Sequence, residues 1–144
     1  MTVSLLALVA AAAAATAPAH SLEIEHRGVN YAVDYVTHVE TRSKAIGISP
    51  STRPSSRRCL VTAEVAVERR IQPASGGQAI ASRLPGTRSF TQNHPGDCRR
   101  DGKEAAKLVA SKSKAIGAHV RERASADHQD TLAAIDAARN FAVN

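Results

Sequence analysis

The sequence has very few aromatic residues: no Trp, two Tyr and two Phe in 144 residues. Aromatic side chains make the largest single burials in a protein core, so their scarcity predicts a small core of Val, Ile, Leu and Ala. Proteins that bind single-stranded nucleic acid combine positive charge with aromatic stacking platforms. The composition therefore argues against nucleic acid as a partner.

The sequence also lacks the residue spacings of common catalytic and metal sites. It has no Gly-x-Ser-x-Gly elbow for a nucleophilic serine, and no phosphate-binding loop, because Gly76-Gly77 is not followed by Lys and Ser or Thr. No Cys-x-x-Cys or His-Glu-x-x-His pair places two zinc ligands on one turn. We predict no catalytic residues and no cofactor. The alternative is a secreted or periplasmic hydrolase or metal-dependent enzyme whose site is dispersed along the sequence.

The first 19 residues contain no charged side chain and become Ala-rich after Leu5. They end in Ala17-Pro18-Ala19, a small-x-small pattern typical of signal peptidase sites. We predict a signal peptide over residues 1–19 and a periplasmic or secreted mature chain that begins at His20. The alternative is a retained anchor, because about 20 apolar residues can span a bilayer. No transmembrane segment is expected in the mature chain.

Only two cysteines are present, Cys59 and Cys98. An even number of cysteines in an exported chain favours a disulfide, whereas two buried thiols are the alternative in a reducing compartment. A disulfide here closes a loop of about forty residues, for which the loop-entropy model gives about 4 kcal/mol. Domains of this size are stable by about 5–15 kcal/mol. The bridge is therefore expected to supply a large share of the stability.

Basic residues outnumber acidic ones, 19 to 13, and the net charge is +6. A basic surface attracts anionic partners, which for an exported chain are an anionic lipid, a cell-envelope polymer or a protein. An ordinary solvated surface is the alternative reading. The candidate contact residues lie in two clusters, Arg53, Arg57 and Arg58, then Arg99 and Arg100.

Two segments alternate between apolar and polar residues with the two-residue period of a strand. The first covers about residues 22–41, with Arg27-Gly28 as a hairpin turn or bulge near its start. The second covers about 59–71 and is expected to pair antiparallel with the first. Residues 43–58, which are rich in Ser, Pro and Arg, are predicted as a connection. Residues 73–97 contain repeated Gly and Pro turn pairs and are predicted as a long loop. The alternative is that this segment contains short elements, a helical turn at residues 78–83 and a short strand at residues 88–92.

The C-terminal part is predicted to be helical over about residues 101–124 and 127–142, with a break and a new cap at Asp127. The first helix has a narrow apolar stripe at Val109, Ile116 and Val120. The apolar positions of the second are Leu132, Ile135, Ala138 and Phe141. Residues 20–144 are therefore predicted to form one small α+β domain. Its antiparallel sheet of two to three strands is covered by one or two helices and cross-linked by one disulfide.

A mature chain that starts at His20 would carry an α-amine and an imidazole on one residue, and these two nitrogens can chelate Cu(II). This arrangement is similar to that of copper-dependent polysaccharide monooxygenases and some periplasmic copper carriers. His26, His38 or His94 would supply the further ligand. Nothing else in the sequence resembles those proteins. We therefore predict no metal site and keep copper as an alternative.

Together these features predict a small, basic, exported protein without enzymatic activity. Its expected role is a binding or interaction module for an anionic surface or a protein partner. The basic loops between Ser49 and Arg58 and between Arg83 and Arg100 are the expected contact regions. The prediction depends on charge and on the absence of catalytic spacings.

Overall fold

The computed structural model describes residues 19–99 and 102–143. The predicted signal peptide therefore lies outside the described residues except for its last residue, and so does Arg100. Five strands are followed by three helices: β1 (His20–His26), β2 (Val29–Ile46), β3 (Arg58–Pro73), β4 (Ile80–Arg83), β5 (Arg88–Pro95), α1 (Lys103–Ser111), α2 (Ser113–Ala126) and α3 (His128–Val143).

The strands form one antiparallel sheet built on the long β2–β3 hairpin. β1 lies beside β2, and β4 and β5 pair with opposite halves of β3. The α+β class is confirmed, but the sheet is larger than the predicted two to three strands. Residues 73–97 are not one long loop, because they hold β4 and β5. The alternative of a short strand at residues 88–92 is confirmed by β5, whereas residues 80–83 form β4 and not a helical turn. These strands are short, and β5 is largely polar and exposed, so neither shows a clear alternation.

The first predicted strand is divided by a tight turn into β1 and β2. Arg27 and Gly28 both have positive φ, 51° and 75°, as required at both central residues of a type I′ hairpin turn. The predicted turn is therefore confirmed. β2 then continues to Ile46, so residues 43–46 are strand and were wrongly assigned to a connection. Their ladder with Arg58–Val61 overrides the weak strand propensity of this Ser- and Lys-containing stretch.

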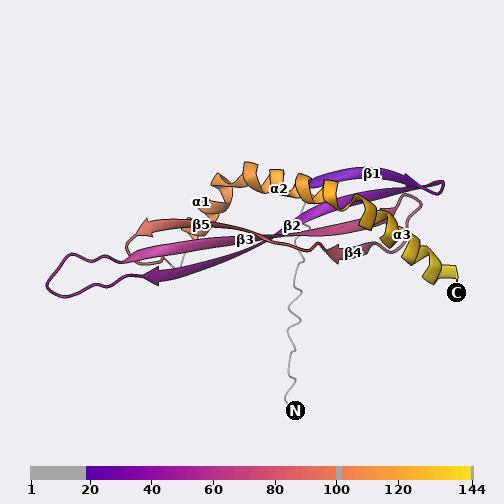
Figure 1. The fold of residues 1–144 in the computed structure, drawn as a ribbon. Coiled ribbons are helices and arrows are strands. Elements are labelled where there is room, and N and C mark those ends of the chain that lie inside the picture. The colour runs from indigo at the N-terminus through magenta and orange to yellow at the C-terminus, as the bar shows by residue number, and fades with distance from the viewer. Residues whose placement is uncertain (1–18, 100–101, 144) are drawn as a thin grey trace, which may run out of the picture.

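One face of the β2–β3 hairpin forms the core, and the helices lie along this face (Figure 1). Alternate residues of both strands are fully buried there, including Val33 opposite Ile71 and the Val61, Val65 and Val67 series. This matches the predicted alternation. The core divides into a larger cluster beneath α2 and α3 and a smaller one beneath α1, beside the disulfide. Within the described ranges, no helix is long and apolar enough to cross a membrane.

The helical part contains three helices, not the one or two that were predicted. The first predicted helix is interrupted at Lys112, whose φ of −100° and ψ of 4° are not helical. This interruption lets Leu108, absent from the predicted stripe, become fully buried while Val109 is only half-buried. The predicted burial of Phe141 is also wrong, because 86% of its side chain is exposed. The C-terminal end of α3 extends beyond the end of the sheet (Figure 1).

Candidate functional site

The most basic part of the described chain is the hairpin arm, which we define as residues 41–60. It comprises the distal end of β2, the loop 47–57 and the start of β3. The arm carries five basic and no acidic side chains: Arg42, Lys44, Arg53, Arg57 and Arg58. Its tip projects beyond the helices at one end of the sheet (Figure 1). Such a segment concentrates positive potential away from the rest of the molecule.

The neck of the arm's loop is closed by hydrogen bonds between Ile48 and Ser56. The Ser56 amide donates to the Ile48 carbonyl over 3.0 Å, and the Ser56 hydroxyl donates to the same oxygen over 3.1 Å. Gly47 has a φ of 92°, and a Cβ atom at this position would collide with the Ser56 carbonyl. The closed neck leaves the Ile48 side chain 69% exposed. An exposed aliphatic residue thus stands among the basic residues of the arm.

The disulfide links the segments that carry Arg58 and Arg99. Cys59 and Cys98 are joined, with their Cα atoms 4.8 Å apart, so the predicted bridge is confirmed. Arg58 precedes one of these cysteines and Arg99 follows the other, so the bridge brings their backbone segments near one another although they lie far apart in the sequence. Arg57 forms a 3.1 Å ion pair with Asp97. Arg53 and Arg58 are exposed.

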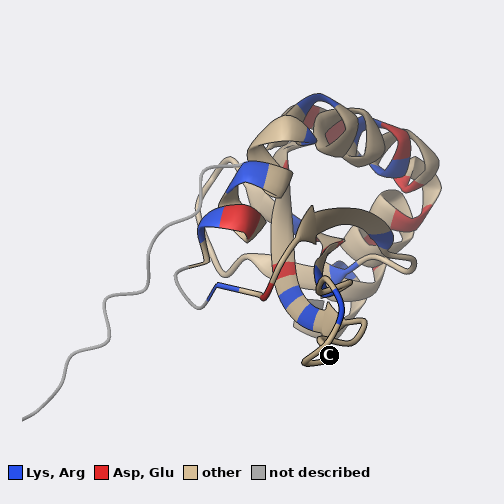
Figure 2. Ribbon diagram, turned by 90° about the vertical axis from the view of Figure 1, so that its left-hand side faces the viewer, with Lys and Arg blue, Asp and Glu red and all other residues tan. Residues whose placement is uncertain are grey.

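Basic side chains also continue along the face of the sheet that lies opposite the helices. Arg42 contacts Glu40 and Glu64 at 3.7 Å and 3.5 Å, and Lys44 lies beyond it toward the tip. These residues line a hollow of about 420 Å³ on this face. Figure 2 gives the view from the hairpin end, in which both basic and acidic bands are visible on the strands and on the helices. The arm is more strongly cationic than the helical layer, because residues 103–143 carry seven basic and five acidic side chains, whereas the arm carries five basic and no acidic ones.

A buried polar network that was not predicted from the sequence lies beneath α2 and α3. Arg69 of β3 and Asp127, between α2 and α3, are each only 6% exposed. The Arg69 Nη1 atom donates to Asp127 Oδ1 and Oδ2 over 2.8 Å and 3.0 Å. The hydroxyls of Tyr35 and Thr131 both donate to Asp127 Oδ2, over 3.1 Å and 2.9 Å. The Arg69 Nη2 atom reaches the Ser82 hydroxyl over 3.0 Å.

This network explains why Asp127 is more than a helix cap. The predicted break at Asp127 is present, but its carboxylate turns to the sheet and joins β2, β3 and α3. Burial raises the pKa of the Tyr35 hydroxyl, which keeps this group protonated as a hydrogen-bond donor. One sequence feature indicated the position of Arg69: it shares the parity of Val67 and Ile71, and therefore the buried face of β3. The network holds the helices on the sheet.

The candidate copper ligands do not meet in the structure. His20 begins β1 opposite Tyr35, and the Nε2 atom of His26 lies 2.9 Å from Asp136 Oδ1 on α3. His38 lies on the opposite face of the sheet, with its Nε2 atom 2.9 Å from Glu68 Oε2. Among residues 19–99 and 102–143, no three His, Cys, Asp or Glu side chains are grouped to hold a metal ion.

Comparison with known proteins gives no match to any protein-family model, curated protein or solved structure. The function is therefore argued from the geometry of the arm and from the chemistry of its side chains.

Proposed function

We propose that this protein is a non-enzymatic binding module of the periplasm or the extracellular space, and that its hairpin arm docks on an anionic lipid surface. The observation that carries the proposal is the charge of residues 41–60, five basic and no acidic side chains on a projecting hairpin. Export is supported by the Ala-rich leader with its small-x-small end. The disulfide suits an oxidising compartment.

The charge of the arm favours lipid phosphates as its ligands. Each Lys or Arg close to an anionic bilayer contributes about 1 kcal/mol of attraction. This attraction decays within a Debye length, about 8 Å at physiological ionic strength, so only the basic residues that reach the surface contribute. Arginine also matches phosphate geometry with two parallel hydrogen bonds. Four of the five basic residues of the arm are arginines.

The exposed isoleucine distinguishes a lipid surface from an acidic polymer. Ile48 stands at the neck of the cationic loop with 69% of its side chain exposed. Burial of an aliphatic side chain in an apolar medium contributes about 1.5–3 kcal/mol. A bilayer offers such a medium beneath its head groups, whereas a solvated polyanion does not. The combination of basic residues with an exposed Ile48 therefore favours an anionic lipid surface over an acidic polymer.

The test compares the binding of the oxidised protein to vesicles of phosphatidylglycerol mixed with phosphatidylcholine, and to vesicles of phosphatidylcholine alone. The double variant Arg53→Gln/Arg58→Gln removes about 2 kcal/mol of attraction, so we expect binding to the anionic vesicles to weaken about thirtyfold. The matched control Lys114→Gln/Arg121→Gln removes the same charge from α2. It is expected to bind within about threefold of the wild type.

Two further measurements test the lipid assignment. Binding of the wild type is expected to fall steeply as the salt concentration rises. Ile48→Ser is expected to weaken vesicle binding without changing the binding of a soluble polyanion such as heparin. Equal loss in the arm variant and in the α2 control would contradict docking by the arm. Unchanged vesicle binding by Ile48→Ser would contradict lipid as the ligand of the arm and favour an acidic polymer.

A further inference from the structure

A cavity of about 570 Å³ lies at the end of the sheet opposite the hairpin arm. It is bordered by the start of β2, the connection from β3 to β4, and the last turns of α3. Its walls are mainly apolar and include Pro73, Ile80, Ile135 and Ala138. Small-molecule sites typically have volumes of about 300–1,000 Å³ and a largely apolar lining with a few polar groups. The cavity has these properties.

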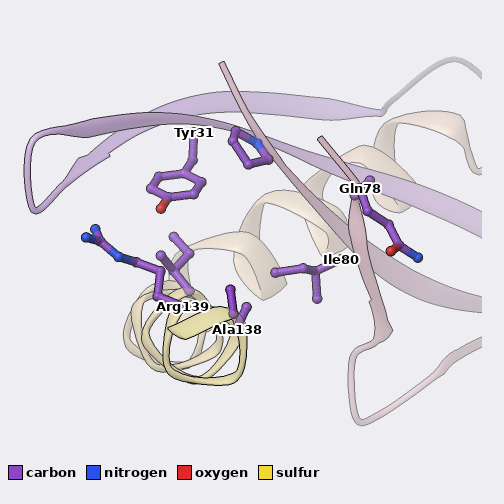
Figure 3. Close-up of a pocket in the computed structure, with 9 residues that line it drawn as sticks. Tyr31, Gln78, Ile80, Ala138 and Arg139 are labelled. Carbon is purple, nitrogen blue, oxygen red and sulfur yellow. The ribbon is translucent and has the colours of Figure 1, made fainter. Parts of the chain in front are cut away.

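The polar groups of the cavity gather on one side. Figure 3 shows the Tyr31 ring directed into the cavity, with its hydroxyl toward α3, and the Arg139 side chain on the same side. Gln78 points away on the far side, beyond Ile80. One end of the cavity thus carries a hydroxyl and a guanidinium, and the rest of the cavity is apolar.

The charge around this polar end is positive. Asp136, one turn before Arg139 on α3, contacts His26 and Arg27, with Asp136 Oδ1 lying 2.9 Å from His26 Nε2 and 3.1 Å from Arg27 Nε. The hydrogen bond from His26, with the charges of Arg27 and Arg139, holds the pKa of the Asp136 carboxyl below its ordinary value. Asp136 is therefore ionised and engaged by the β1–β2 turn. Among the described residues that line the cavity, Arg139 is the only charged one. The neighbouring Asp136 carboxylate is already paired with Arg27, so an anion is favoured beside Arg139.

We propose that this cavity binds a single-chain amphiphile with an anionic head group. Its hydrocarbon chain lies against Ile80, Ile135 and Ala138, and its carboxylate or phosphate accepts hydrogen bonds from Arg139 and from the Tyr31 hydroxyl. The proposal does not depend on the hairpin arm, because the two sites lie at opposite ends of the sheet and share no residue. It assigns the protein a ligand in addition to the surface on which it docks.

The test titrates the oxidised protein with monomeric decanoate, dodecanoate, dodecyl phosphate and dodecanol by calorimetry. Each added methylene is expected to tighten binding about fourfold, and both anions are expected to bind at least tenfold more tightly than dodecanol. The order of the two anions tells whether a carboxylate or a phosphate is the better head group. Absence of a chain-length dependence, or equal binding of the alcohol, would overturn the proposal.

Variants locate the site. Arg139 is exposed, so Arg139→Gln is expected to keep the fold, to weaken dodecanoate binding about tenfold and to leave dodecanol unchanged. Ala138→Phe is expected to fill the cavity and weaken both ligands, with its fold checked by circular dichroism. Arg121→Gln on α2 is the matched control and binds as the wild type. Equal losses of dodecanoate affinity in Arg139→Gln and Arg121→Gln would refute the site. We expect Arg53→Gln/Arg58→Gln to bind dodecanoate as the wild type does, which would show that the cavity and not the hairpin arm binds this ligand.

Discussion

Replacing Asp127 by Asn is expected to lower the free energy of unfolding by about 3–5 kcal/mol, the usual cost of leaving one partner of a buried ion pair uncompensated. The structure gives the reason. Arg69 is 6% exposed and directs Nη1 at both Asp127 oxygens, and its Nε atom has no hydrogen-bond partner among the described residues. The loss is a large fraction of the roughly 5–15 kcal/mol that stabilises a domain of this kind.

A second variant separates the charge effect from simple loss of packing. Arg69→Met combined with Asp127→Leu removes both charges, so no unpaired charge remains in the interior. We expect this double variant to lose less stability than the sum of the losses caused by Arg69→Met and by Asp127→Leu alone. It should remain less stable than the wild type by about 1–3 kcal/mol for each buried hydroxyl, of Tyr35 and Thr131, that lacks an acceptor. The coupling energy between the two positions is then different from zero, because each single variant leaves a charge unpaired and the double variant does not.

The assay is urea denaturation at pH 7, followed by far-ultraviolet circular dichroism because the chain has no Trp. Arg70→Met is the matched control: Arg70 lies on the other face of β3, is 42% exposed, and contacts Glu68. We expect this substitution to cost less than about 1 kcal/mol. A loss below about 1 kcal/mol for Asp127→Asn, or a double variant that shows the sum of the single losses, would refute the described network.

Two further predictions concern the disulfide and a buried imidazole. Cys59→Ser/Cys98→Ser is expected to lower the free energy of unfolding by about 4 kcal/mol, because the bridge joins residues 39 apart; urea titration that shows less than about 1 kcal/mol would contradict this. His119 is 3% exposed, and burial, then the charge of Arg123, lowers its pKa below 6.5. The unfolded chain thus takes up a proton first, and stability falls as the pH drops from about 6.5 toward the folded-state pKa. His119→Gln should reduce the change in the free energy of unfolding over this pH range. His128→Gln, at an exposed histidine, should leave that change as in the wild type. Equal pH slopes of the free energy of unfolding in all three proteins would exclude His119 as the cause.

The long strands were predictable because their alternation persists over many residues. β2 and β3 bury one parity against the helices, and the sequence shows this parity from Val29 to Val39 and from Cys59 to Ile71. β4 and β5 were not predictable in this way. Ile80–Arg83 has four residues, and Arg88–Pro95 follows a Pro-Gly turn with few apolar positions. Their strand conformation comes from antiparallel pairing with β3 and not from local sequence preference.

The basic residues could be identified from the sequence, and the proximity of two of their segments follows from the disulfide. Once Cys59 and Cys98 are joined, the backbone segments that carry Arg58 and Arg99 lie near one another. The partner of Arg69 was not predictable, because it comes from a position 58 residues away. A strand pattern shows that a side chain faces the core but not which helix residue it meets there.

The separation of the two proposed sites follows from the same hairpin. Tyr31 borders the cavity and Ile46 ends β2 at the arm. Fifteen residue-to-residue steps along the strand separate them, roughly 50 Å at about 3.3 Å per step. The network around Asp127 fixes α2 and α3 to the middle of this ladder, so the distance does not depend on a flexible linker. It exceeds the range over which surface charge acts. A protein docked through its arm with the sheet directed away from the bilayer therefore presents a ligand in the cavity to the solvent, and the binding free energies at the two sites should add.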